Sequence, residues 1–337
     1  MHMTSDSHAQ SGGHLDVTVI LCTYNRCGDL ANALENIAAS QMPTSVTWEV
    51  LVVDNNSTDQ TRDVVEGFKC RFPGRFRYIF EGRPGKSHAL NTAIAESRGE
   101  VLAFVDDDVT MDATWLQNLT AELHEGKWAG TGGRILPPEG FTPPRWLPMS
   151  EFAILCAHFD LGDQPSELNR APYGGNMAFR KDVFEKHGGF RLDLGPRPNS
   201  QIRNEDTEFG RRLLAAGERL RYEPSAVVHH PVPNSRVTQS YFFSCWLDYG
   251  RAMIREYGER PDLYGIPRDY LSMLRCAMEI TVLTLRSMIA LHPQERFSHK
   301  CQVRRWAGQM AELYSRSISR KRTKAADAQE ARSKIAS

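Results

Sequence analysis

The stretch Val101-Leu102-Ala103-Phe104-Val105-Asp106-Asp107-Asp108 indicates an α/β fold with a ligand site at the edge of a sheet. Five consecutive apolar residues are typical of a strand that is buried on both faces. Because unpaired buried charge is costly, the three acids must lie at the C-terminal end of this strand, where open α/β sheets bind ligands. A hard cation such as Mg²⁺, Mn²⁺ or Ca²⁺ would relieve their repulsion, often together with substrate phosphates. An acidic, solvated turn is the alternative that the stretch leaves open.

The preceding segments predict three more strands, separated by helices. The apolar stripe of the first helix is Leu30, Leu34 and Ile37, and Ser57 with Gln60 predicts a capping box for the second helix. This alternation with short connections is typical of βαβ units and a mostly parallel sheet. The predicted strands cover residues 17–22, 48–53 and 76–80, and the third helix begins at about residue 86. Asp54 ends the second strand, so we expect it at the same sheet edge as Asp106.

Three later segments are candidates for the same site, and each has a purely structural alternative. Gly174-Gly175 allow close approach of the backbone to a ligand, or simply a tight turn before a strand. Glu205 and Asp206 begin a predicted helix, where acids are also favourable for capping and dipole reasons. His229-His230 end a late strand, as metal ligands or as ordinary polar residues.

Composition and charge limit the class of protein. The 337 residues include 41 basic and 41 acidic ones, but residues 296–337 hold eleven Lys/Arg and three Asp/Glu, a local charge of +8 against −8 elsewhere. This basic end suggests an anionic partner such as a membrane or nucleic acid, or a solvated tail. Seven cysteines without a C-x-x-C pair argue against a disulfide framework and a structural zinc site, and favour a reducing cytosol.

The chain is expected to end in helices. Long helical patterns cover residues 241–257 and 270–292, and a basic helix covers 304–322. They would pack on the core or lie on a membrane surface, since no stretch of about 18 uncharged apolar residues predicts a membrane span. We therefore expect a disordered lead at 1–14, a main domain at 15–235, a helical region at 236–325 and a flexible tail at 326–337.

Taken together, six segments resemble the family-2 glycosyltransferases of the GT-A fold, in family order over about Val17 to Asn234. They are Val19-Ile20-Leu21-Cys22-Thr23-Tyr24-Asn25-Arg26, Val52-Val53-Asp54-Asn55-Asn56-Ser57-Thr58-Asp59, Gly85-Lys86-Ser87-His88-Ala89-Leu90-Asn91, Asp106-Asp107-Asp108, Gly174-Gly175-Asn176 and Glu205-Asp206.

The resemblance implies a GT-A type, Rossmann-like, mostly parallel sheet flanked by helices, with a C-terminal helical extension. It also implies an inverting transferase that uses Mn²⁺ or Mg²⁺ to move a sugar from a nucleotide sugar, expected to be a UDP-sugar, to a hydroxyl of a glycan, lipid or small molecule. The implied general base is Asp206, and the implied metal ligands are Asp108 and His230. Implied nucleotide-sugar contacts are Thr23, Tyr24, Asn25, Arg26, Asp54, Asn56, Lys86, Asn91, Asp106 and Asp107, with Gly174, Gly175, Asn176 and Glu205 in the donor or acceptor pocket.

Three other functions remain open at this point. A retaining GT-A enzyme would share the metal site, and a sugar nucleotidyltransferase also uses paired acids and a metal, but releases pyrophosphate. A non-catalytic binding protein on the same fold would have no need of Asp206. For the glycosyltransferase we expect a cytoplasmic location with peripheral contact to the inner face of an anionic membrane, and no nucleic-acid partner.

Overall fold

Four parallel strands, in the order β3-β2-β1-β4, form the half of the sheet that carries the acids. The computed structural model describes residues 15–198, 200, 202–257 and 268–336, so the predicted lead at 1–14 lies outside the described residues. The strands are β1 (Leu15–Thr23), β2 (Trp48–Asp54), β3 (Phe76–Phe80) and β4 (Gly99–Val105). Their bounds confirm the four strands expected from the apolar runs.

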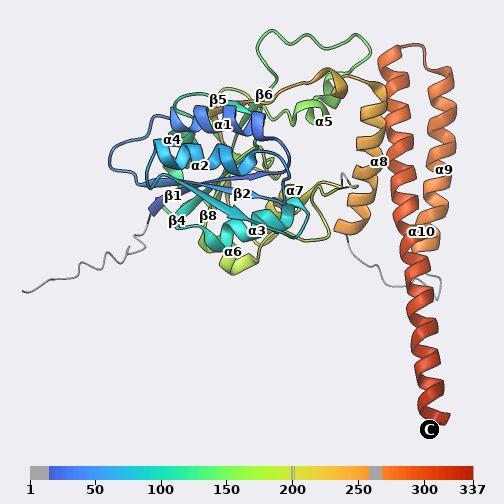
Figure 1. Ribbon diagram of the computed structural model, residues 1–337. Helices are drawn as coiled ribbons and strands as arrows, with labels where there is room; N and C mark the ends of the chain where they lie inside the picture. Colours follow the sequence, from blue (N-terminus) through green and yellow to red (C-terminus); the bar gives the residue numbers. More distant parts are fainter. Residues whose placement is uncertain (1–14, 199, 201, 258–267, 337) are drawn as a thin grey trace, which may run out of the picture.

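Helices α1 (Cys27–Ala38), α2 (Thr61–Arg71) and α3 (Lys86–Glu96) connect these strands. Figure 1 shows α1, α2 and α4 (Trp115–Thr120) on one face of the sheet and α3, α6 (Asp182–His187) and α7 (Glu205–Ala215) on the other. Both faces are therefore covered, which explains why the strands are apolar without alternation.

The predicted capping box at Ser57 is wrong. Helix α2 begins at Thr61, and the Asp59 carboxylate accepts hydrogen bonds from the backbone N–H of Thr61 at 3.0 Å and of Cys27 at 2.9 Å. One carboxylate therefore serves the first residues of both α1 and α2. The Ser57 hydroxyl instead accepts from the backbone N–H of Asn25, because the two loops after β1 and β2 lie side by side.

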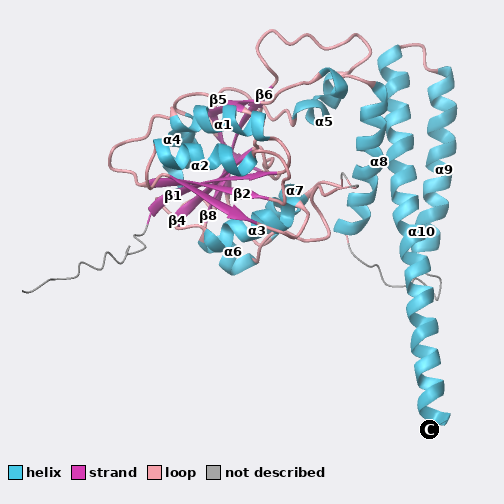
Figure 2. Ribbon diagram, in the orientation of Figure 1, coloured by secondary structure: helices cyan, strands magenta, loops and turns pink. Residues whose placement is uncertain are grey.

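The second half of the sheet is mixed. β8 (Asn176–Arg180) runs antiparallel between β4 and β6 (Gly130–Leu136), and β9 (Leu220–His229) runs parallel to β6. Short strands β5 (Thr110–Met111) and β7 (Ser166–Leu168) pair with β9. Of the nine strands in this sheet, β3, β2, β1, β4, β6 and β9 share one direction, which agrees with the expected mostly parallel sheet (Figure 2).

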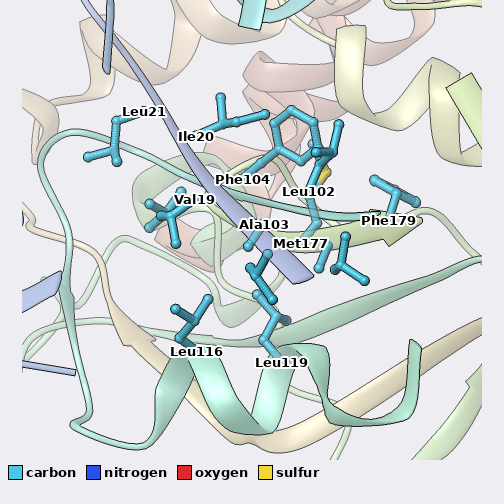
Figure 3. Close-up of a cluster of buried hydrophobic side chains, with 14 of the residues drawn as sticks. Val19, Ile20, Leu21, Leu102, Ala103, Phe104, Leu116, Leu119, Met177 and Phe179 are labelled. Carbon is cyan, nitrogen blue, oxygen red and sulfur yellow. The ribbon is translucent and has the colours of Figure 1, made fainter. Parts of the chain in front are cut away.

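The core between β4, β8 and the helices is built from large apolar side chains. Leu102 and Phe104 of β4 lie beside Met177 and Phe179 of β8, with Leu116 and Leu119 of α4 nearby (Figure 3). All are at most 1% exposed. This packing holds β4 rigidly, so the acids that follow it emerge at a defined point of the sheet edge.

The C-terminal helices form a separate layer beside the sheet (Figure 1). They are α8 (Gln239–Glu256), α9 (Arg268–Ile289) and α10 (Pro293–Ala336), and α10 packs against both of the others. A small apolar cluster, which includes Leu147, Phe242 and Phe297, connects α8 and α10 to the segment after β6 that leads to α5 (Phe152–Cys156). Among the described residues, no helix is long and apolar enough to cross a membrane.

The backbone of α10 differs from the expectation in two ways. The predicted basic helix at 304–322 is the middle of a 44-residue helix, and the helical backbone continues to Ala336, where a flexible tail was expected from residue 326. Residues 321–336 are mostly Ala, Lys, Arg, Glu and Gln, the residues with the highest helix propensity.

Candidate active site

The carboxyl ends of β1, β2 and β4 bring the predicted acids to one edge of the sheet. Thr23 at the end of β1 pairs with Asp54 at the end of β2, and Ile20 of β1 pairs with Phe104 of β4. Asp106, Asp107 and Asp108 follow β4 directly. This is the edge at which open α/β sheets bind ligands.

Asp54 is buried and is held by two donors. Its Oδ1 accepts from the Ser57 backbone N–H at 2.8 Å, and its Oδ2 accepts from the Tyr78 hydroxyl at 2.8 Å. Burial and this hydrogen bond raise the pKa of Tyr78 to about 12. Each carboxylate oxygen keeps a second lone pair, so Asp54 can still accept from a ligand. Tyr24, with 44% of its surface exposed, lies just beyond the end of β1.

The loops after β1 and β2 are fixed by asparagines. Asn25 has a left-handed backbone, and its Oδ1 accepts from the Thr58 N–H at 2.7 Å. Asn55 donates to the Arg83 carbonyl at 2.7 Å and accepts from the Gly85 N–H at 2.7 Å, so it shapes the turn before Lys86. Asn56, expected to contact the nucleotide, is an exposed left-handed turn residue. This role of Asn55 was not predicted, although the residue lies in the quoted motif.

Lys86 connects the strand edge to the start of α7. Its Nζ donates to Asp106 Oδ1 at 2.7 Å and lies 3.8 Å from Glu205 Oε1. Burial alone would lower the pKa of Lys86, but Asp106 and Glu205 outweigh it and the pKa is raised. Burial opposes the effect of Lys86 on Asp106, whose pKa nevertheless falls to about 2. Burial and the neighbouring Asp206 raise the pKa of Glu205 to about 7.

Asp106, Asp108 and His230 form a cluster that could hold a metal ion. One ligand atom of each lies within 4.8 Å of the others. Asp108 Oδ1 is buried without a hydrogen-bond partner among the described residues, 3.8 Å from His230 Nε2. Two carboxylates and an imidazole are a suitable ligand set for Mn²⁺ and related ions, and the unpartnered oxygen fits such an ion. His229 lies apart from the cluster, with Nε2 3.9 Å from Asp112.

Two arginines face the same carboxylates. Arg26 Nη1 donates to Asp107 and to Asp108, each at 3.0 Å, and Arg236 Nη2 lies 3.6 Å from Asp108 Oδ2. Burial raises the pKa of Asp107 to about 6, against the opposing effect of Arg26. Arg26, Asp108, Pro138 and Arg236 are among the residues that line an adjoining cavity of about 350 Å³. Arg236 was not predicted from the sequence, because a lone arginine in a three-residue 3-10 helix carries no local motif.

Asp206 lies on the other side of the Gly174-Gly175 segment. Its Oδ2 accepts from the Gly174 N–H at 2.6 Å, and its Oδ1 accepts from the Thr207 N–H at 2.6 Å. A Cβ atom on Gly174 would stand 3.1 Å from Asp206 Oδ2, and one on Gly175 would stand 3.1 Å from Asp106 Oδ2. The glycine pair therefore lets two carboxylates of the site approach the same stretch of backbone.

Two of the expected site residues have hydrogen-bond partners within the protein. Asn91 donates to the Phe190 carbonyl and accepts from the Phe190 N–H, both at 2.8 Å. Asn176 is fully buried, accepts from Trp115 Nε1 at 2.8 Å and donates to the carbonyls of Arg134 and Ala226. Both amides are thus engaged by the protein, Asn91 with the loop after α6 and Asn176 between β8, β6 and β9, and their contacts with substrate stay predictions.

Two known proteins are similar to about two thirds of this chain. The chain is 31% identical over 229 residues to succinoglycan biosynthesis protein ExoM of Rhizobium meliloti, which is 68% of this chain and 70% of ExoM. It is 28% identical over 215 residues to glycosyltransferase AglE of Haloferax volcanii, covering 64% and 66% of the two chains.

Two solved structures share the fold. Mannosyltransferase PcManGT from Pyrobaculum calidifontis, in complex with GDP-Man and Mn²⁺, aligns with a TM-score of 0.57 at 20% identity, over 91% of this chain and 87% of that one. S. aureus TarS 1–349 in complex with UDP aligns with a TM-score of 0.51 at 14% identity, over 90% and 92%. Residues 18–188 match the model of the family described as glycosyl transferase family 2. With this match, the relatives and the GT-A fold, the chain belongs to glycosyltransferase family 2, a family of enzymes that transfer sugars from nucleotide-sugar donors.

Proposed function

We propose that this glycosyltransferase is a metal-dependent, inverting enzyme that moves a sugar from a UDP-sugar to a hydroxyl group of a glycan, lipid or small molecule. The observation that carries the proposal is the arrangement around Gly174-Gly175. Asp106, with the cluster that it forms with Asp108 and His230, lies against Gly175, and Asp206 lies against Gly174. The cluster that would neutralise the leaving diphosphate and the carboxylate that would serve the acceptor therefore lie against two neighbouring residues of one segment.

The donor end of the site would bind the nucleotide through the loops after β1 and β2. Thr23, Tyr24 and Asp54 would contact the base, with Asp54 accepting from its N–H. Lys86 and Arg26 place positive charge next to the acids that follow β4. A diphosphate bound between these two side chains would be stabilised by that charge. In this proposal Asp107 contacts the ribose or the cation, and Asn25 and Asn56 shape the loops around the base.

Asp106, Asp108 and His230 would hold the divalent cation, Mn²⁺ or Mg²⁺. When bound, the cation supplies charge neutralisation for the departing diphosphate. The chain's own arginines Arg26 and Arg236 face the same carboxylates and would help to hold the phosphate oxygens.

Asp206 would be the general base. It would accept the proton of the acceptor hydroxyl as that oxygen attacks the anomeric carbon, with Glu205 beside it shaping the pocket. Its hydrogen bonds from the N–H groups of Gly174 and Thr207 fix the carboxylate in one orientation. Attack from the face opposite the diphosphate inverts the anomeric centre, whereas retention would need two successive inversions or attack on the face from which the diphosphate departs.

The test begins with a panel of UDP- and GDP-sugars in the presence of Mn²⁺, and measures release of nucleoside diphosphate. With the active donor, Asp206→Asn should keep donor affinity and melting temperature, while transfer falls by at least about 100-fold, the usual effect of losing a positioned base. Asp182→Asn, at the exposed start of α6, is the matched control and should transfer normally. Near-normal transfer by stable Asp206→Asn protein would refute Asp206 as the base. Pyrophosphate release from a nucleoside triphosphate would instead support a nucleotidyltransferase.

The acceptor and the cellular location also belong to the proposal. The cytoplasmic location remains a prediction, as does peripheral contact of the basic C-terminal helices with an anionic membrane. A hydroxyl acceptor that is attached to a lipid would make that contact useful, because enzyme and acceptor would then share one surface.

A further inference from the structure

Helix α9 is apolar on two opposite sides, and within the described part of the chain only one of them is covered. The covered side includes Cys276 and Leu283, spaced seven residues apart and at most 9% exposed, and Ala290 just past the end of the helix is also buried; α9 packs against α10. At about 100° per residue, the opposite side carries a stripe of large apolar residues that are 39–77% exposed. The stripe consists of Leu271, Leu274, Met278, Val282, Leu285 and Ile289.

A cationic cavity adjoins this stripe. It has a volume of about 660 Å³ and lies between α8, α9 and α10. Arg296, Lys300 and Arg304, one helical turn apart on α10, line it, and none of its lining residues is acidic. Met288 of α9, which is 71% exposed, also lines the cavity and lies next to Ile289 of the stripe. Apolar surface and positive charge therefore meet at one end of the helical layer.

This combination matches the boundary between lipid headgroups and acyl chains. Helices that lie in that boundary bury one apolar face and place Lys and Arg against anionic phosphates. We propose that α9 lies flat on an anionic lipid bilayer, with the stripe inserted among the acyl chains and Arg296, Lys300 and Arg304 on lipid phosphates. Insertion along the surface also agrees with the finding that no described helix is suited to cross a membrane.

The same end of the layer is joined to the active site. Phe297 of α10 packs against Phe243, a wall of the cationic cavity, at 5.8 Å between ring centroids, and against Trp146 at 4.8 Å. Trp146 belongs to the Pro-rich segment 137–148, whose Pro138 lines the cavity beside Asp108. A bilayer bound at α9 would thus lie near a segment that borders the active site. This consequence rests on the proposed function, namely sugar transfer at this site, whereas lipid binding itself does not depend on that activity.

A second copy of the chain is the other occupant to consider for the stripe. In a two-fold dimer the same patch meets itself, so the cationic cavities of the two copies would approach each other. Since acidic residues do not line the cavity, such a dimer would leave its positive charge uncompensated. Charge complementarity therefore favours an anionic bilayer.

Vesicle co-sedimentation of the full chain, without donor or acceptor, tests the inference. The vesicles are phosphatidylcholine with and without phosphatidylglycerol. We expect binding to the anionic vesicles that weakens at high salt. Leu274→Glu/Leu285→Glu should weaken binding by at least about tenfold, because charge enters the apolar stripe. Lys300→Glu/Arg304→Glu should weaken binding to the anionic vesicles by about tenfold or more, and so remove the preference for them.

Leu192→Glu is the matched control, since Leu192 is 51% exposed on the sheet domain and should leave binding unchanged. Leu274→Ser/Leu285→Ser removes apolar surface without adding charge and should also weaken binding.

Failure of the wild type to bind anionic vesicles at low salt would overturn the inference, as would an equal loss of binding in Leu192→Glu. A dimer in light scattering that Leu274→Glu/Leu285→Glu dissociates, without vesicle binding, would assign the stripe to self-association. Nucleoside diphosphate release by the same variants, with a soluble acceptor, reports separately on the proposed function.

Discussion

At the scale of single residues, Asp108 is the acid that most needs a cation. One of its oxygens is buried without a hydrogen-bond partner among the described residues, and the other faces Arg26 and Arg236. We expect UDP to bind wild-type protein at least about tenfold more tightly with Mn²⁺ than with chelator, since metal relieves the repulsion between Asp108 and the diphosphate. Asp108→Ala should lose that enhancement. Calorimetric titration with UDP measures the gain in affinity from Mn²⁺, and Asp112→Ala, at a half-exposed residue, is the control. If Asp108→Ala shows the same gain as the wild type, Asp108 is not a metal ligand.

Glu205 predicts a pH dependence of stability. Its pKa in the folded protein is raised to about 7 by burial and by Asp206, from an ordinary value of 4.5. The native state therefore binds this proton more tightly than the unfolded state, and stability falls as pH rises through the window from about 4.5 to 7. Glu205→Gln cannot ionise, so above pH 7 the metal-free variant should be more stable than wild type by roughly 1–3 kcal/mol.

Urea unfolding at pH 5 and pH 8 in chelator measures this difference. Exposed Glu139→Gln is the control and should follow the wild type at both pH values. If Glu205→Gln gains nothing between pH 5 and pH 8, Glu205 is ionised in the folded protein and is compensated by Lys86, 3.8 Å away.

At the scale of elements, the turn before β8 sets the position of the start of α7. A Cβ atom on Gly174 would stand 3.1 Å from Asp206 Oδ2, so Gly174→Ala must shift the carboxylate by a few tenths of an ångström. Donor affinity should change little, but transfer should fall by about 10- to 100-fold because the base is displaced. Gly67→Ala in α2, where a Cβ atom meets nothing within 4 Å, is the control and should keep full transfer. Unchanged transfer in Gly174→Ala would show that the position of Asp206 is not critical.

The sequence predicted the elements whose pattern is local. β1, β2 and β4 are continuous apolar runs that end in polar residues, so their burial and the edge they share could be inferred. Short strands such as β5, with two residues, carry no period and were not predicted. The capping residue of α2 was assigned incorrectly because Ser57 and Asp59 are both good caps, and only the neighbouring loop after β1 selects Asp59.

At the scale of the whole molecule, two glycines let α8 and α10 touch backbone to backbone. A Cβ atom on Gly308 would stand 1.9 Å from the Leu247 carbonyl oxygen, and one on Gly250 would stand 2.0 Å from that of Arg305. A rigid backbone cannot yield, so Gly308→Ala should force the helices apart and lower stability by about 1–3 kcal/mol. Thermal unfolding measures the loss, with Gly28→Ala in α1, where a Cβ atom meets open space, as control. An unchanged melting temperature would contradict this helix contact.

The arrangement of the C-terminal layer could not be inferred from the sequence. Helix α9 has apolar residues on two sides, so its pattern alone does not distinguish the covered side from the exposed stripe. The candidate site was more predictable, since Asp106, Asp108 and His230 cluster and Asp206 lies beside the same glycine pair as Asp106. The protein partners of Asn91 and Asn176 were not predicted, because an amide serves equally well for a ligand or for backbone groups.

The salt bridges of Arg26 make the binding of the metal ion and the binding of the nucleotide-sugar donor interdependent. Arg26 pairs with Asp107 and with Asp108 Oδ2 at 3.0 Å, so a metal ion on the unpartnered Oδ1 of Asp108 must compete with an internal cation for the charge of the same carboxylate. A bound diphosphate offers Arg26 another anionic partner and removes that competition. Donor and metal should then bind with positive cooperativity, each raising the affinity of the other by the same factor. Arg26→Ala should bind Mn²⁺ alone more tightly than the wild type, and the factor by which UDP raises Mn²⁺ affinity should fall toward one. Titrations of Mn²⁺ with and without UDP measure this factor. If the factor does not fall, Arg26 does not couple donor binding to metal binding.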